Sequence, residues 1–205
     1  MIESNREIKK PSEKREIMPR FEASALRGYC VSVLTASGVE RSCAEAVADA
    51  LIDAELTGVS THGVSRLAVY MQRMDAGVMS RENNIRIVRE STSTLVVDAG
   101  NSLGAAAAKF AMERCIAKAK ETGCCFASVH SSNHFGTAAY YTRLAAAQDM
   151  IGFACPNLKG NIAPFGSAGW YRSFRPSCRS AASSCPARSG VCTARCGMPG
   201  SPSST

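Results

Sequence analysis

Residues 123–136, GCCFASVHSSNHFG, join a short apolar run to a polar turn and set the fold class. The run from Cys124 to Val129 predicts a buried strand, and Gly123 before it marks the end of a preceding helix. A helical pattern resumes after Gly136. A histidine on a loop at the end of a strand is well placed for chemistry, because imidazole titrates near neutral pH. The turn is therefore the first candidate for a functional site.

Helical and strand patterns alternate on both sides of this turn. Apolar residues recurring every three or four positions predict helices at about 21–38, 40–56, 61–77, 104–120 and 137–148. Short apolar or alternating runs predict strands at 85–88 and 94–97, and a second buried strand at 150–155. This order of elements favours an α/β or mixed α+β fold.

Composition divides the chain into four parts. Residues 1–19 are charged and poor in apolar side chains, which predicts a disordered leader, with Met18 as an alternative start. We expect a helical domain at 20–80 and an α/β domain at 81–168. Residues 169–205 contain five arginines, no acidic residue, no leucine and no isoleucine, and they lack any period of 2 or 3.6. We interpret this tail as non-native, from a reading-frame shift, with a genuine disordered tail as the alternative.

The overall composition and net charge restrict the class of protein. An apolar fraction of 45% and a charged fraction of 20% are typical of a globular protein. No apolar run approaches the roughly 18 to 20 residues that span a bilayer, and the charged start is no secretory signal, so we expect a cytoplasmic protein without a membrane partner. The net charge of +7 lies mostly in the tail. Those arginines could bind an anionic surface weakly, but without interleaved aromatics they predict no specific nucleic-acid partner.

A zinc site in the tail is the weaker interpretation of its cysteines. Structural zinc sites use ligand pairs two to four residues apart, and only the last two tail cysteines approach that spacing. The four residues concerned are Cys178, Cys185, Cys192 and Cys196. We predict no metal site.

Three residues of the third predicted helix offer a partner for the histidine turn. His62, Arg66 and Tyr70 are spaced i, i+4 and i+8 and would share one helix face. Arginine can hold a carboxylate through two parallel hydrogen bonds, and a nearby histidine can exchange a proton. Oxidation or reduction at a 2-hydroxy or 2-oxo acid requires both. The alternatives are a structural histidine and a solvated arginine.

Four stretches resemble the malate/L-lactate dehydrogenase family, which is distinct from the Rossmann-type lactate and malate dehydrogenases. They are GVSTHGVSRLAVYMQRMDAG (58–77), VDAGNSLGAAAAKFAMERCIAKAKETG (97–123), VHSSNHFGTAAYYTRLAAAQDMIGFACPN (129–157) and NIAPFGS (161–167). The HGVSRL helix start and the SNHFG turn are specific when they occur together. Gly100 to Gly104 does not form a GxGxxG fingerprint, in agreement with a non-Rossmann cofactor domain.

The resemblance implies a hydride-transferring oxidoreductase that uses NAD or NADP on a small 2-hydroxy or 2-oxo acid, and a homodimer. It implies His134 as the proton donor and acceptor, with His62 and Arg66 beside it. Arg66 and Tyr70 would bind substrate. Asn157, Pro164 and Gly166 would lie near the cofactor.

The resemblance also implies a truncated chain, because the family continues well beyond the position of Ser167. Members are expected to have a helical domain and a complete cofactor-binding sheet domain, of which this chain would carry a part. The alternative is an inactive fragment that acts only by associating with another subunit.

Overall fold

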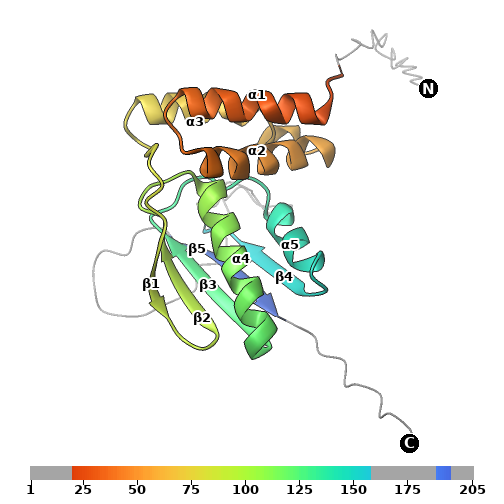
Figure 1. Cartoon of the computed structure of the whole chain (residues 1–205), viewed down its shortest axis with the longest axis vertical. Coiled ribbons are helices and arrows are strands. Elements are labelled where there is room, and N and C mark those ends of the chain that lie inside the picture. The colour runs from red at the N-terminus through yellow and green to blue at the C-terminus, as the bar shows by residue number, and fades with distance from the viewer. Residues whose placement is uncertain (1–19, 158–187, 195–205) are drawn as a thin grey trace, which may run out of the picture.

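The structure, a computed structural model, describes residues 20–157 and the backbone of 188–194. Three helices form one layer above a sheet, and two more helices lie against one face of that sheet (Figure 1). The predicted mixture of helices and strands is confirmed. The helices are α1 (Ala23–Ala36), α2 (Arg41–Leu56), α3 (Ser65–Asp75), α4 (Gly104–Thr122) and α5 (Ala138–Ala146), with a 3₁₀ turn, η1 (Ser60–His62), before α3. The strands are β1 (Arg86–Glu90), β2 (Thr94–Asp98), β3 (Cys124–His130), β4 (Ile151–Cys155) and β5 (Arg188–Ala194).

The strands lie in the order β1-β2-β3-β5-β4. The pair β2 and β3 is parallel and is connected through α4, whereas the other three pairs are antiparallel. In a parallel pair the two strands end at the same edge, so the turns that follow β2 and β3 lie next to each other. Those two turns form the foundation of the site described below.

Helix α4 lies along the sheet and also contacts α2, which lies above one end of it in Figure 1. The helix is rich in small side chains. Six of its alanines are buried, namely Ala105, Ala106, Ala107, Ala108, Ala111 and Ala119. Small side chains allow the helix to approach its neighbours closely, and the buried residues of the helical layer and of the sheet form one core. Gly123 ends α4 with a φ of 84°, as the sequence predicted.

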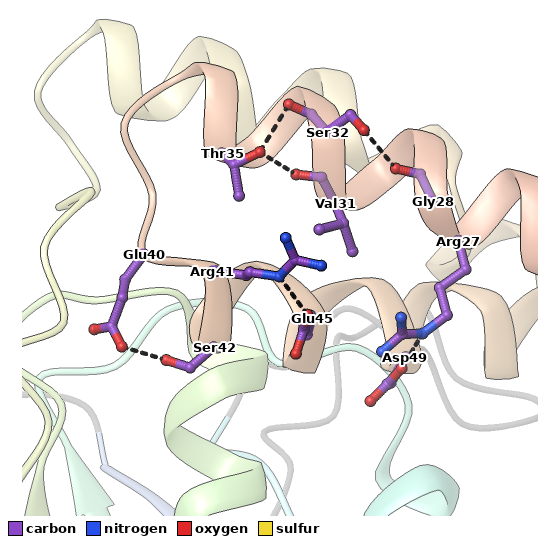
Figure 2. Close-up of polar contacts among 10 residues, drawn as sticks. All are labelled: Arg27, Gly28, Val31, Ser32, Thr35, Glu40, Arg41, Ser42, Glu45 and Asp49. Carbon is purple, nitrogen blue, oxygen red and sulfur yellow. Dashed lines mark hydrogen bonds and ion pairs between the residues drawn. The ribbon is translucent and has the colours of Figure 1, made fainter.

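Polar contacts hold α1 and α2 of the helical layer together and join them to α4. Arg27 of α1 donates to Asp49 of α2 at 2.6 Å (Figure 2), and Lys109 of α4 donates to the same carboxylate at 3.0 Å. Burial alone would raise the pKa of Asp49, but these two hydrogen bonds outweigh it and the pKa is lowered. The carboxylate therefore stays charged at neutral pH and joins three helices.

The strands predicted as buried are covered on one face only. In β3, Cys125, Ala127 and Val129 are buried beneath α4, whereas Phe126 is 47% exposed. In β4, Ile151 and Phe153 are each 59% exposed. Helices α4 and α5 pack against a single face, so an apolar run of this length does not imply burial on both sides. The prediction of buried strands was therefore wrong for the outward faces of β3 and β4.

The third predicted helix is interrupted. His62 lies in η1, Gly63 has an extended backbone, and α3 begins only at Ser65, so His62 does not share a helix with Arg66. The carboxylate of Glu55 occupies the space beside Gly63, where a Cβ would lie 2.1 Å from Oε1. That oxygen accepts a hydrogen bond from the backbone N–H of Val64 at 2.8 Å. The expected spacing of i, i+4 and i+8 on one helix was wrong for His62.

Strand β5 lies within the tail for which the sequence predicted no regular structure. Its backbone pairs with both β3 and β4, so at these residues the structure differs from that expectation. Backbone pairing satisfies the open edges of β3 and β4 whatever side chains the added strand carries. The predicted leader 1–19, residues 158–168 and the rest of the predicted tail lie outside the described residues, and the domain limits stay predictions.

The contact between α5 and β4 gives a test of this packing. A Cβ at Gly152 would lie 2.8 Å from the Thr142 Cα and 2.9 Å from its carbonyl oxygen. We expect Gly152→Ala to lower the free energy of unfolding by about 1–3 kcal/mol, measured by urea denaturation. Gly28→Ala in α1 is the control, because nothing lies within 4 Å of its Cβ position, and it should add about 0.5–1 kcal/mol. Equal effects of the two substitutions would contradict the close packing.

Candidate active site

The turn after β3 is fixed to the turn after β2 through their backbones. Ala99 N–H donates to the carbonyl of His130 at 3.0 Å, and Asn101 N–H donates to that of Ser131 at 2.8 Å. Asn101 and Ser131 both have positive φ, 61° and 52°. Two turns with uncommon backbone conformations are thus held in register by each other.

Asn133 adds a side-chain clamp to this pair of turns. Its amide nitrogen donates to the backbone oxygen of Asn101 at 3.0 Å, to its side-chain oxygen at 2.9 Å and to the Ser102 carbonyl at 3.0 Å. Ser102 is buried, and its hydroxyl donates in turn to the Glu82 carbonyl. Sequence analysis assigned no role to Asn133 or Ser102. The signal available was an asparagine placed directly before the candidate histidine.

The first residue of α4 lies directly against this turn. A Cβ at Gly104 would lie 2.2 Å from the Asn133 carbonyl oxygen and 2.5 Å from that of His134. These are backbone atoms of a clamped turn and cannot move aside cheaply. Glycine at this position therefore allows the histidine turn to sit on the amino end of α4.

His134 lies half-buried beside Tyr70, which reaches it from α3. The Tyr70 hydroxyl lies 2.8 Å from Nδ1 of His134, and the tyrosine is 3% exposed. Burial raises the pKa of Tyr70 to about 12, so the hydroxyl keeps its proton at neutral pH. A hydroxyl can donate to or accept from an imidazole nitrogen. The contact commits Nδ1 to Tyr70 and leaves Nε2 as the nitrogen that can meet a ligand.

The surroundings of His134 favour its neutral form. Burial first, and then the neighbouring groups Arg66, His62 and Arg73, together lower its pKa from 6.5 to about 4. At pH 7 the imidazole is therefore uncharged and able to accept a proton. An anion bound beside these cations would offset their effect and raise the pKa again.

His62 and Arg66 complete the group of predicted residues. The His62 and His134 rings have centroids 5.3 Å apart and are tilted by 30°. The hydroxyl of Thr61 lies 3.0 Å from Nδ1 of His62, and its carbonyl accepts Nε of Arg66 at 2.6 Å. Although His62 is not on α3, the 3₁₀ turn still brings it to His134.

Glu55 is a further positioning residue that sequence analysis missed. By accepting the N–H of Val64 it fixes the junction between η1, which carries His62, and α3, which carries Arg66. Nothing in the local pattern marks this residue, since it lies on α2 and its partner is nine residues away.

His130 belongs to a different cluster. Its Nδ1 lies 3.0 Å from the Ser131 hydroxyl and 3.6 Å from the Asp98 carboxylate, which also pairs with Arg86. Within the described part of the chain, no group of three metal-ligating side chains occurs. Cys192 has only its backbone described, and the other three tail cysteines lie outside the described residues.

Of the predicted cofactor residues, only Asn157 can be placed. It is exposed just beyond the end of β4, whereas Pro164 and Gly166 lie outside the described residues. No described helix is long and apolar enough to cross a membrane.

A family model described as malate/L-lactate dehydrogenase matches residues 21–184. The chain belongs to the malate/L-lactate dehydrogenase family. The match includes the η1–α3 junction, the amino end of α4 and the histidine turn, which together build the site.

Individual relatives within this family are dehydrogenases. L-sulfolactate dehydrogenase of Methanocaldococcus jannaschii is 40% identical over 136 residues, which is 66% of this chain and 40% of that protein. An NAD⁺-dependent ureidoglycolate dehydrogenase of Escherichia coli is 29% identical over 143 residues, covering 70% of this chain and 41% of that protein. The solved structure of malate dehydrogenase from Pyrococcus horikoshii superposes with a TM-score of 0.69 at 37% identity, over 72% of this chain and 42% of that one. The chain thus spans about two fifths of the length of these relatives.

The depressed pKa of His134 can be measured directly, because the chain has three histidines. We expect one imidazole to titrate near pH 4 by NMR and to vanish from the spectrum in His134→Gln. Between pH 4 and 6.5 the unfolded chain binds a proton at this residue and the folded chain does not, so folding stability should fall as the pH falls through that window. The substitution should flatten this fall. A midpoint near 6.5 would contradict the burial of the ring.

Proposed function

We propose that this chain carries the proton-transfer and substrate site of an NAD- or NADP-dependent oxidoreductase acting on small 2-hydroxy or 2-oxo acids. The observation that carries the proposal is the neutral imidazole of His134, which contacts Tyr70 and is acted on by the positive charges of Arg66 and Arg73. Family membership supports the reaction class. The names of the relatives favour malate, sulfolactate or a related acid as substrate.

His134 moves the proton in this reaction. In the oxidative direction Nε2 accepts the proton of the substrate hydroxyl while a hydride leaves the adjacent carbon, and an oxo group results. In the reductive direction the imidazolium returns that proton to the oxo oxygen. A pKa near 4 in the free site suits the first role, and a bound anionic substrate would raise it toward the second.

Tyr70 positions His134. For Nε2 to accept a proton, Nδ1 must carry the other hydrogen and donate it to the Tyr70 oxygen, which lies 2.8 Å away. Because the hydroxyl can accept as well as donate, the contact persists when the ring becomes charged. This role differs from the direct substrate binding that the sequence suggested, since the hydroxyl is already engaged with the imidazole.

Arg66 is placed to hold the substrate carboxylate. Its Nε is bound to the Thr61 carbonyl, which orients the guanidinium and leaves its two terminal nitrogens as donors. The ring of His62 stands beside that of His134 and contributes a further donor to the same space.

The residues present fit part of a nicotinamide dinucleotide. The amino end of α4 is covered by the histidine turn, so it offers no Rossmann-type phosphate cradle. The exposed amide of Asn157 would pair with a carboxamide, and the Thr137 hydroxyl is buried without a hydrogen-bond partner in the described region. When bound, the cofactor would take up or release the hydride.

The assay for the proposal combines the full 205-residue chain, NAD or NADP, and malate, sulfolactate or lactate. We expect reduced nucleotide to form and His134→Gln to lower kcat by at least about 100-fold. His130→Gln is the matched control, because it removes an imidazole from the same strand end that faces Asp98, and it should leave kcat within about twofold.

Two results would count against the proposal. Equal losses in both variants would remove the proton-transfer role from His134. No turnover with any of the three acids would favour the inactive fragment that associates with another subunit. Sedimentation of the same sample tests the homodimer that we propose with the activity.

Tyr70→Phe tests the positioning role separately. It keeps the buried ring and removes the contact to Nδ1, so we expect kcat to fall about tenfold while KM stays within about threefold. Tyr29→Phe, at an exposed tyrosine of α1, is the control and should change neither constant. A rise in KM with kcat unchanged would instead assign the hydroxyl to substrate binding.

A further inference from the structure

The permanent charges that act on His134 are those of Arg66 and Arg73, and both are positive. The third group that acts on it is His62, and no carboxylate is among them. The same two arginines act on Tyr70. A half-buried site with this balance attracts anions and has no counter-ion of its own in the described part of the chain.

The two arginines also differ from most others in the structure. Five arginines of the described residues pair with an acidic side chain, namely Arg27, Arg41, Arg81, Arg86 and Arg143. Arg66 and Arg73 form no such pair among the described residues. Asp75, the acid of α3, is bound by Arg81. Both guanidinium groups are therefore available to an anion from outside the protein.

The spacing of these residues on α3 places them on one side of the helix. Arg66, Tyr70 and Arg73 are at i, i+4 and i+7, within a sector of roughly 60° at 100° per residue. Tyr70, which lies between the two arginines in the sequence, contacts His134. With a rise of about 1.5 Å per residue, the Cα atoms of the two arginines lie about 10 Å apart along the axis. The flexible side chains can converge from the two sides on a small molecule at His134.

We propose that Arg73 is a specificity-determining residue that binds a second acid group of the substrate, so that the site prefers dianionic 2-hydroxy acids over monoanionic ones. Arg66 holds the carboxylate next to the reacting carbon, and Arg73 holds the carboxylate or sulfonate at the far end. The inference rests on the proposed function and adds to it the charge of the substrate.

The alternative for Arg73 is a solvated charge that only stabilises the carboxyl end of α3 through the helix dipole. The two interpretations differ in a measurable way. A solvated charge affects folding but not the choice between two ligands, whereas a direct ligand to the second acid group affects one ligand selectively.

The experiment measures binding of malate and of lactate to the full 205-residue chain at pH 7 and constant ionic strength. The two acids share the 2-hydroxy carboxylate and differ by one carboxylate group. Shifts of the His134 imidazole NMR signals report occupancy without cofactor or turnover. The variants are Arg73→Gln, Arg73→Lys and Arg66→Gln, with Arg89→Gln as the control, because Arg89 is an exposed arginine of β1 that does not act on His134.

We expect the unaltered chain to bind malate about 10- to 100-fold more tightly than lactate, the range for a hydrogen-bonded charge pair. Arg73→Gln should remove most of this ratio by weakening malate while lactate changes less than about threefold. Arg73→Lys should keep part of the ratio, and it serves as the test if the glutamine variant does not fold. Arg66→Gln should weaken both acids, and Arg89→Gln neither.

An unchanged malate-to-lactate ratio in both Arg73 variants would overturn the inference while leaving the proposed function in place. An equal loss for the two acids in Arg73→Gln would do the same, since it would show a general effect of charge. Failure of the unaltered chain to bind either acid would overturn both the inference and the proposed function.

Discussion

The absence of a side chain at Gly104 is the constraint on which the rest of the site depends. It lets two backbone carbonyls of the histidine turn lie against the first turn of α4, where a Cβ would come within 2.2 Å of one of them. The buried alanines that follow extend this close contact along α4, and the helix supports both the sheet and α2. The turn is thus positioned by the core of the molecule and not by its own sequence alone.

Local patterns were sufficient for most of the helices and strands, whereas the roles of the site residues stay predictions. Periodicity and glycine placement predicted five helices and four strands, and the turn containing His134 was recognised from its position after an apolar strand. The break at Gly63 was not predictable in this way, because its cause is a carboxylate contributed by Glu55 from another helix. Strand β5 was not predicted because its sequence lacks the apolar or alternating pattern of the other strands, although its backbone pairs with β3 and β4. The exposure of one face of β3 and β4 was not predicted, because an apolar run does not show whether one or both faces of a strand are covered.

The charged groups around each histidine could not be predicted from residue types alone. His130 lies 3.6 Å from the carboxylate of Asp98. His134 instead contacts Tyr70, and the positive charges of Arg66 and Arg73 act on it, so the two histidines have different surroundings. The difference depends on which side chains the sheet edge and α3 bring together, although the two histidines lie within one five-residue stretch of the sequence.

The hydrogen bond between Tyr70 and His134 crosses from the helical layer to the sheet layer. Its two ends are held by separate parts of the molecule, one by the packing of α3 and the other by the paired turns above the sheet. Burial and the two arginines of α3 lower the pKa of His134, so this pKa depends on how the helical layer and the sheet layer pack together.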